Sequence, residues 1–473
     1  MQHVKIGFIP SHRESFGDDW AARMRARCVE QFKRVPGLDL VVPDESLTRR
    51  GLVYSLEEGE RARDLFLREQ VAGVIVGGMT FGHETSAVGV VVAGLPHGTP
   101  VLQFATKAAP MSESGMRPSD SWCGQFAITS ALRRRAIRFQ HIPTCFPEEP
   151  VFAREAARFV RACAAVQGFR GARLGQIGAR PEEFESVWWD EASLQKSFNQ
   201  TVVPVDLAEM FARMEAVGSE AKETQDLMEE MSTGVDIGAI PRQCLSNLAR
   251  AEIALRQLAR EKHLVGMGVN CWTQVQQRFG ICVCSVLGRL TDSGLMASCE
   301  TDIYGAATMW AAYLASLGQV APHFIDWTEL HPEQENVFLA WHCGNAPPSL
   351  CGTGCMPRFL PQPFVPPDPS WGTLHMRLRL GPVTCARLVE YDGHFSMFIG
   401  QGEVCDTGPE THGTYGWVRV DDVLEWERVM VEKGIIHHGV LIHDPEVGPA
   451  LESFCEFLGI EVIRAGSSQR RLA

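Results

Sequence analysis

The strongest constraint on the fold is the regular alternation of short apolar runs and helical patterns over residues 1–165. The apolar runs are typical of buried strands, and in the longer segments between them apolar residues recur at helical spacing. The expected strands are residues 4–9, 38–42, 71–76 and 101–104, and the expected helices are residues 18–32 and 56–70. This β-α-β order predicts a doubly wound parallel sheet.

Ligands of such sheets bind at the carboxyl ends of the strands. In this region those ends carry Ser11-His12-Arg13, Gly77-Gly78-Met79-Thr80 and Gln103-Phe104-Ala105-Thr106. Polar side chains therefore gather where a ligand is expected.

A second α/β unit is expected over residues 166–320. Residues 173–178, 202–206 and 280–286 are typical of strands, and residues 206–231 and 241–266 of helices. Gly175 and Gly178 do not form a Gly-x-Gly-x-x-Gly motif, so the sequence gives little support for a dinucleotide site.

The pattern changes after residue 320, where short alternating runs are separated by turn residues. The expected strands are residues 373–380, 383–391, 395–400 and 417–420. Asp392-Gly393 lies between two of them and is a strong hairpin signal. We therefore predict two doubly wound α/β domains, residues 1–165 and 166–320, followed by a mainly antiparallel β-barrel domain, residues 321–473.

Composition and charge narrow the class of function. The formal net charge is −13, which disfavours a nucleic-acid partner. No apolar run approaches the roughly 18 residues of a membrane helix, and the N-terminus lacks a signal-peptide pattern. The 15 cysteines are scattered, which favours buried free thiols in a reducing compartment. We expect a cytoplasmic protein without a nucleic-acid or membrane partner.

Several polar residues occur where apolar strands end, and each has a structural alternative. Glu300 and Asp302 precede an expected helix, so each is either a helix cap or a site acid. A strand-end aspartate such as Asp326 is more often part of a turn, and a single histidine such as His342 more often belongs to the core. For Cys343, a structural role is favoured over a role as a catalytic nucleophile.

Two adjacent histidines, His437 and His438, occur in an expected strand, where neighbouring side chains point to opposite faces. At most one of them is therefore expected to face a given site. Two carboxylates and one histidine suit a hard divalent cation such as Mn²⁺ or Mg²⁺. The spacing alone does not show that these residues meet.

Cys299-Glu300-Thr301-Asp302-Ile303-Tyr304-Gly305-Ala306 resembles the C-E-x-D-x-x-G-A motif of the L-fucose/L-arabinose isomerase family. Asp326 and Trp341-His342-Cys343-Gly344-Asn345 resemble the family's next two active-site segments. Gly434-x-x-His437-His438 resembles its paired-histidine strand. Phe81-Gly82-His83-Glu84-Thr85 resembles a family loop that borders the site of a neighbouring subunit. The resemblance spans nearly the whole chain.

The resemblance implies a metal site made of Glu300, Asp326 and His438. Arabinose isomerases add a further histidine ligand, for which His342 is the nearby match and which fucose isomerases do not need. We also expect His342 to contact the substrate, together with Asn345.

The resemblance gives two further expected substrate contacts, His83 and Met79. Met79 stands where fucose isomerases carry an aromatic residue. This departure from the family pattern means that the identity of the substrate does not follow from the resemblance.

The activity implied is aldose–ketose isomerisation of a monosaccharide. A divalent metal, expected to be Mn²⁺, would polarise the carbonyl of the open-chain sugar. Glu300 and Asp326 would share the proton transfer through an ene-diol. Family members assemble as hexamers or trimers, so a homo-oligomer is expected.

Two alternatives stay open. One is isomerisation or epimerisation of a modified sugar, for example an anionic or deoxy sugar. The other is a non-catalytic cytoplasmic sugar-binding protein, which would not need two carboxylates and a histidine around a metal.

Overall fold

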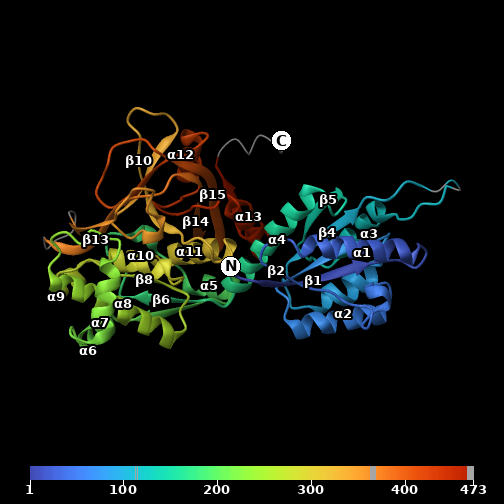
Figure 1. Ribbon diagram of the computed structural model, residues 1–473, viewed down its shortest axis with the longest axis horizontal. Coiled ribbons are helices and arrows are strands. Elements are labelled where there is room, and N and C mark those ends of the chain that lie inside the picture. The colour runs from blue at the N-terminus through green and yellow to red at the C-terminus, as the bar shows by residue number, and fades with distance from the viewer. Residues whose placement is uncertain (112, 114, 363–368, 466–473) are drawn as a thin grey trace. The chain divides into compact units, whose positions relative to one another are not determined.

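The computed structural model describes residues 1–111, 113, 115–362 and 369–465 (Figure 1). The chain divides into two compact units. Unit 1 comprises Met1–Gln167 and Ser453–Gly459, and unit 2 comprises Gly168–Glu452 and the residues from Ile460 onward. The division of the chain into three domains stays a prediction.

Unit 1 is built on a parallel sheet with the strand order β2-β1-β3-β4-β5. Its strands are β1 (Val4–Ser11), β2 (Leu38–Val41), β3 (Gly73–Gly78), β4 (Val101–Thr106) and β5 (Gln140–Cys145). Its helices are α1 (Asp18–Phe32), α2 (Leu56–Glu69), α3 (Ser121–Arg134) and α4 (Pro150–Phe169), with a π-helix over Thr85–Val91. The direction of the strand order reverses between β1 and β3, the position where such sheets bind ligands.

Both faces of this sheet are covered by helices, as a doubly wound fold requires. On one face Phe8 of β1 packs edge-on against Phe32 of α1, with ring centroids 5.2 Å apart. On the other face Ile9 shares a core with Phe66 of α2 and Ile128 of α3. The alternation of side chains along β1 thus supplies both cores.

Unit 2 begins with a second parallel sheet, of strand order β7-β6-β8-β9. Its strands are β6 (Arg173–Ile177), β7 (Thr201–Val205), β8 (Gly266–Val269) and β9 (Met296–Ser298). Its helices are α5 (Glu191–Phe198), α6 (Leu207–Ala216), α7 (Lys222–Ser232), α8 (Arg242–Lys262), α9 (Gln274–Phe279), α10 (Cys284–Asp292) and α11 (Ile303–Ala315).

Two expectations for this region are wrong. Residues 280–286 are not a strand: Gly280 ends α9 in a left-handed conformation, and α10 begins at Cys284. The apolar character of the run is that of a buried helix start, which periodicity cannot separate from a buried strand over so few residues. The single helix expected over residues 206–231 is two helices, α6 and α7, because the chain turns between Val217 and Ala221.

The remaining part of unit 2 is a mainly antiparallel sheet that closes on itself. Strands β16, β11, β10, β17, β14 and β15 are paired in that order, and β15 pairs again with β16. These strands are β10 (His323–Leu330), β11 (Val337–His342), β14 (Gly381–Tyr391), β15 (His394–Cys405), β16 (Thr414–Arg419) and β17 (His438–Ile442). The predicted barrel is confirmed, as is the hairpin turn at Asp392-Gly393 between β14 and β15.

Three more strands extend the barrel sheet at its edges: β12 (Arg358–Gln362), β13 (Ser370–Arg377) and β18 (Glu461–Arg464). Helix α12 (Val423–Glu432) follows β16, and α13 (Val447–Leu458) precedes β18.

Most cysteines are buried free thiols, as expected, but Cys351 and Cys355 form a disulfide. Among the described residues, the helices are all too short or too polar to cross a membrane.

Candidate functional site

Glu300 lies just beyond the carboxyl end of β9, where a parallel sheet presents its ligand-binding residues. Glu300 and Thr301 both adopt left-handed backbone conformations, with φ of 52° and 61°. Two successive non-glycine residues in this region are strained, and such strain is found mainly where function requires a fixed geometry. The chain then enters α11, with Asp302 as its N-cap.

This strained turn is attached to the rest of the sheet by hydrogen bonds and by close packing. Thr301 Oγ1 donates to the carbonyl oxygen of Ala179 at 3.2 Å, and Asn270 Nδ2 donates to the same oxygen at 2.6 Å. Gly268 of β8 lies so close that an added Cβ would be 2.7 Å from the carbonyl carbon of Thr301. The position of Glu300 is therefore set by β6 and β8.

The barrel brings Asp326 and His438 together. Asp326 of β10 is directly opposite His438, the first residue of β17, in an antiparallel pair. Side chains of directly opposed residues lie on the same face, with Cβ atoms roughly 5 Å apart. His342, the last residue of β11, completes the group from the other side of β10.

Four side-chain atoms of these residues converge. Glu300 Oε2 lies 3.2 Å from His438 Nε2 and 3.7 Å from His342 Nε2, and Asp326 Oδ1 lies 3.6 Å from His438 Nε2. Glu300 Oε2, Asp326 Oδ1 and His342 Nε2 are buried and form no hydrogen bond. Unpartnered buried polar atoms are costly, and a cation among them removes that cost.

Asp302 and Arg387 orient His438 from behind. His438 Nδ1 lies 2.9 Å from Asp302 Oδ2, so the ring donates its Nδ1 proton there and its Nε2 faces Glu300 and Asp326. Arg387 of β14 binds both oxygens of Asp302, with 3.0 Å between Nη2 and Oδ1. A carboxylate that orients a histidine in this way is typical of metal ligands.

The pKa values reflect this concentration of charge. Burial lowers the pKa of His438, but the hydrogen bond to Asp302 and the interaction with the Glu300 carboxylate outweigh burial and raise it to about 10. Burial raises the pKa of Asp302, but Arg387 and His438 hold it below its usual range. The carboxylates around His438 thus attract positive charge to this site, either as protons or as a bound cation.

Glu300 and Asp326, the two carboxylic acids that face the histidines, differ in the direction of their pKa shifts. Burial raises the pKa of Glu300, but its interactions with the nearby rings of His342 and His438 outweigh burial, so the pKa lies well below its usual range. For Asp326 burial dominates over the two histidines, and its pKa is raised. Two carboxylates whose pKa values are pushed apart are suited to different parts of acid–base chemistry.

The expectation that His437 faces away from the site is wrong. Strand β17 begins only at His438, so His437 precedes the strand and is not bound by its alternation. Its ring lies 4.0 Å from that of His438 and stacks on Phe184 at 5.4 Å. His437, His438 and Asp326 each offer a ligand atom within 4.8 Å of the others.

The converging atoms line a pocket of about 510 Å³ that is contained within unit 2. Its walls combine aromatic and polar side chains, among them Phe184, Trp272, Trp341, Gln362 and Thr411. Aromatic walls with few polar groups are typical of small-molecule sites.

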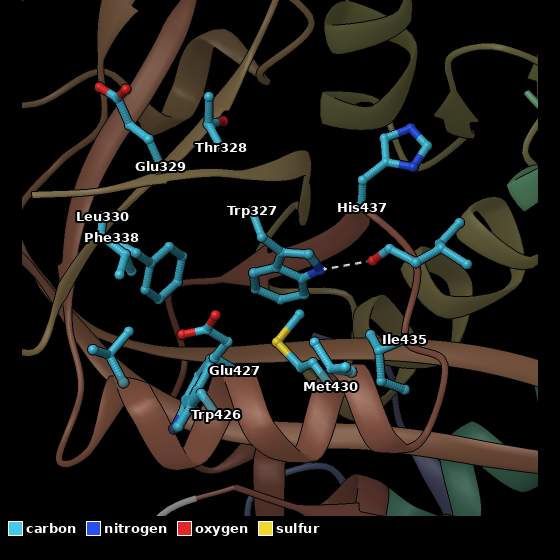
Figure 2. Close-up of a pocket in the computed structure, with 13 residues that line it drawn as sticks. Trp327, Thr328, Glu329, Leu330, Phe338, Trp426, Glu427, Met430, Ile435 and His437 are labelled. Atoms are coloured by element: carbon cyan, nitrogen blue, oxygen red, sulfur yellow. Dashed lines mark hydrogen bonds between the residues drawn. The ribbon is translucent and has the colours of Figure 1, made fainter.

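A neighbouring apolar pocket shares Thr328, Glu329 and His437 with the first one. Figure 2 shows it between β10 and α12, where Trp327 donates a hydrogen bond to the carbonyl oxygen of Ile436. His437 therefore forms part of the wall of both pockets.

The other predicted substrate contacts lie elsewhere. Asn345 is buried, its Nδ2 donates to Cys299 Sγ at 3.4 Å, and it is not among the described residues that line the pocket. Met79 and His83 belong to unit 1, where Met79 is buried after β3 and His83 is half-buried. Their contacts with substrate stay a prediction.

Sequence reasoning missed Arg387 altogether and left Asp302 undecided between cap and site acid. Asp302 is both the cap of α11 and the partner of His438. A signal for Arg387 was available, because a single arginine inside the apolar run of residues 383–389 must find a buried counter-charge.

Comparison with known proteins gives two family matches. The model described as "Fucose/sulfoquinovose isomerase, N-terminal domain" matches residues 7–170, and that described as "L-fucose isomerase, C-terminal domain" matches residues 341–465. A sulfoquinovose isomerase of Alkalicoccus urumqiensis is 27% identical over 304 residues, which are 63% of this chain and 66% of that protein. A sulfoquinovose isomerase of Priestia aryabhattai is 23% identical over 420 residues, 88% of each chain.

Among solved structures, a periplasmic solute binding protein of an ABC transporter from Actinobacillus succinogenes 130z, with bound D-allose, matches at 9% identity. The match covers 67% of this chain and 93% of that one with a TM-score of 0.17, which is too weak to support an argument. The N-terminal and C-terminal family matches follow each other in chain order, so the chain belongs to the fucose isomerase-like family of aldose–ketose isomerases.

Proposed function

We propose that this protein is a divalent-metal-dependent isomerase that interconverts the aldose and ketose forms of an anionic sugar. The observation that carries the proposal is the convergence of Glu300, Asp326, His342 and His438, three of whose facing atoms are buried without a hydrogen-bond partner. A protein that only binds a sugar has no need for this arrangement.

The side chains fit a hard or borderline divalent cation. In an octahedral site with bonds of roughly 2.1 Å, adjacent ligand atoms are about 3 Å apart. Three separations among the four atoms, 3.2, 3.6 and 3.7 Å, are close to that spacing. The residues form two groups that share His438, namely Glu300 with His342 and Asp326 with His437. Two carboxylates with two imidazoles suit Mn²⁺, and we propose that these four residues bind it.

A bound divalent cation would polarise the carbonyl of the open-chain sugar. Glu300 and Asp326 line the same pocket, and they would move the proton between two adjacent carbons of the sugar. The two carboxylates would share the acid and base roles. The sugar would pass through an ene-diol.

The relatives named sulfoquinovose isomerase make a sulfonated sugar the preferred substrate class. Lysine and arginine are absent from the part of the pocket wall that the described residues form. We propose that residues of another copy of the chain bind the sulfonate, and that Met79 and His83 of that copy approach the pocket. Arg13 lies at the same sheet edge, where its Nε donates to the carbonyl oxygen of Gly82.

The thirteen free thiols suit a reducing cytoplasm, with the Cys351–Cys355 pair as the exception. We propose a cytoplasmic enzyme.

The test is a substrate panel. The Mn²⁺-loaded protein is incubated with sulfoquinovose, L-fucose, L-arabinose and D-glucose, and products are identified by ¹³C NMR after removal of the metal. Ketose formation should be fastest from sulfoquinovose. Glu300→Gln and Asp326→Asn keep the shape of the side chains and should each lower kcat by at least about 100-fold.

Two outcomes would replace the proposal. Tight sugar binding without any product would identify a binding protein. Inversion at one carbon without a ketose would identify an epimerase.

A further inference from the structure

A cluster of thiols lies directly behind the carboxylate group. Cys271 follows β8, Cys299 follows β9, Cys284 begins α10, and Cys343 follows β11. The first three are at most 3% exposed. Four separate segments of unit 2 thus each bring a sulfur to one place.

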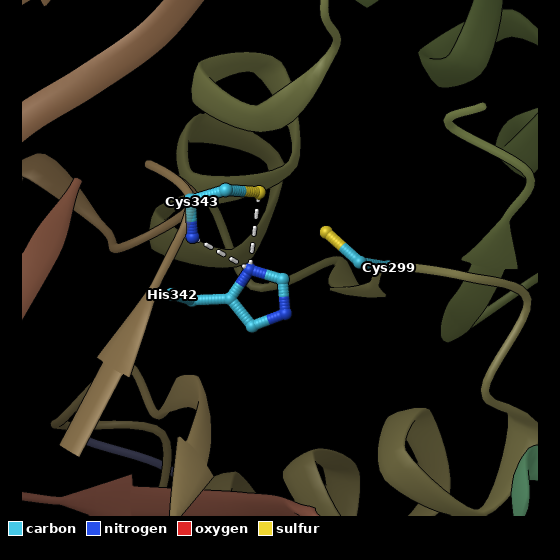
Figure 3. Close-up of side chains that lie close together, drawn as sticks. All are labelled: Cys299, His342 and Cys343. Carbon is cyan, nitrogen blue, oxygen red and sulfur yellow. Dashed lines mark hydrogen bonds between the residues drawn. The ribbon is translucent and has the colours of Figure 1, made fainter. Parts of the chain in front are cut away.

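The sulfur atoms are close enough to share an ion. Cys284 Sγ and Cys343 Sγ are 3.3 Å apart, and ligand atoms of Cys299, His342 and Cys343 all lie within 4.8 Å of one another (Figure 3). In a tetrahedral thiolate site with metal–sulfur bonds of roughly 2.3 Å, the sulfurs are about 3.8 Å apart. Small shifts would produce that spacing.

The surroundings of the cluster favour sulfur as an acceptor. Asn345 is 3% exposed, and its Nδ2 donates to Cys299 Sγ at 3.4 Å while its Oδ1 has no hydrogen-bond partner. Hydrogen bonds from amides to sulfur stabilise thiolates in metal sites. A cysteine that only fills a core would be surrounded by hydrocarbon.

We propose that Cys284, Cys299 and Cys343 form a second cation site, for a thiophilic ion of the Zn²⁺ class. Soft thiolates select such ions, whereas the carboxylates of Glu300 and Asp326 select harder ones. Each thiol releases one proton to water as its sulfur binds the ion, and no electron is transferred. The site does not depend on which sugar the protein isomerises.

His342 connects the two sites. Its Nδ1 accepts a hydrogen bond from the backbone nitrogen of Cys343 at 3.0 Å, which an ion would have to replace, and lies 3.2 Å from Cys343 Sγ (Figure 3). Its Nε2 lies 3.7 Å from Glu300 Oε2. A neutral imidazole has one free lone pair, so it can bind one cation at a time. With Nδ1 as the fourth ligand of the thiol site, His342 is lost to the carboxylate site. A thiophilic ion should therefore weaken Mn²⁺ binding.

The test uses the full-length chain carrying Cys351→Ser and Cys355→Ser, which removes the other close pair of sulfurs. The reduced, Mn²⁺-equilibrated protein is titrated with Cd²⁺ alone, and the sulfur-to-cadmium charge-transfer absorbance is recorded. One equivalent should saturate the band. Cys284→Ser and Cys343→Ser should each weaken Cd²⁺ binding at least about tenfold. Cys163→Ser, a buried thiol of α4 in unit 1, is the matched control and should change nothing.

Absence of the band in the chain with all three thiols overturns the proposal, and this result needs no further variant. A band of equal strength and affinity in the Cys284→Ser and Cys343→Ser proteins also overturns it. Free Mn²⁺, followed by electron paramagnetic resonance, should rise as Cd²⁺ binds. An unchanged Mn²⁺ affinity would show that His342 is not a ligand of the thiol site. Because no sugar is present, these outcomes are independent of the isomerase assay.

Discussion

At the scale of single residues, the proposed metal site takes one of two adjacent histidines as its ligand. His438 has its Nδ1 paired with Asp302 and its Nε2 directed at Glu300 and Asp326. His437 stacks on Phe184 and lines the pocket, and its Nδ1 lies 3.4 Å from the hydroxyl oxygen of Ser186. His438 is therefore the better ligand, and His437 is the better contact for a sugar.

We predict that His438→Ala lowers Mn²⁺ affinity by at least about 100-fold, because even residues that only orient a ligand cost 10–100-fold when lost. His437→Ala should keep substantial activity and mainly raise KM. Mn²⁺ binding by calorimetry and steady-state kinetics check both. If the effects of the two variants were exchanged, His437 would be the ligand.

A second prediction concerns Asp302. Asp302→Asn leaves the buried Arg387 without a counter-charge, a change that typically costs about 3–5 kcal/mol. It also weakens the orientation of His438, so Mn²⁺ affinity should fall by about 10–100-fold. Thermal unfolding and Mn²⁺ titration measure the two effects.

Asp190→Asn is the matched control, since Asp190 also caps a helix of unit 2 but contacts no histidine. It should leave Mn²⁺ affinity unchanged. Equal losses in both variants would mean that Asp302 acts only as a cap.

At the scale of elements, the strained turn after β9 positions Glu300. Gly268→Ala would place a Cβ 2.7 Å from the backbone of Thr301, so the turn must move. We predict a loss of about 100-fold in kcat/KM, because misplacement of a reacting group by about 1 Å has effects of that size. The protein should still fold, at a cost of about 1–3 kcal/mol for overpacking.

Gly218→Ala serves as the control for this variant, since the nearest atom to its added Cβ is 3.9 Å away. Its activity should be that of the unmodified protein. A fully active Gly268→Ala protein would show that the turn does not determine the position of Glu300.

Elements with a strong period were predictable from the sequence, and short ones were not. The helix predicted over residues 18–32 is α1, because its apolar residues recur over four turns. The run over residues 280–286 resembles a strand in sequence, but Gly280 ends α9 and Cys284 begins α10, so only an isolated parallel bridge between Ile281 and Trp371 remains.

The residues of the candidate site are likewise brought together by long-range contacts that local sequence patterns do not contain. Asp326 and His438 meet because β10 and β17 pair in one particular register, which no local pattern contains. The residues alone suggested a hard cation, and only the family resemblance brought Glu300, Asp326 and His438 together. Arg387 was missed because its partner is 85 residues away.

At the scale of the whole molecule, the proposed contact between the sulfonate and a second copy of the chain requires an oligomer. One chain has a mass of 52.3 kDa. We predict a homo-oligomer, preferably a hexamer, in light scattering at working concentration. A mass of one chain would contradict both the assembly and the proposed origin of the sulfonate contact.

The most direct test of the central claim is ketose formation by the protein before and after metal removal. The protein is stripped with a chelator, assayed with sulfoquinovose in D₂O, and assayed again after Mn²⁺ is added, with deuterium on carbon counted by mass spectrometry. The account predicts no turnover in the stripped protein, restored turnover with Mn²⁺, and carbon-bound deuterium from proton exchange at the ene-diol. Full turnover in the stripped protein would contradict it.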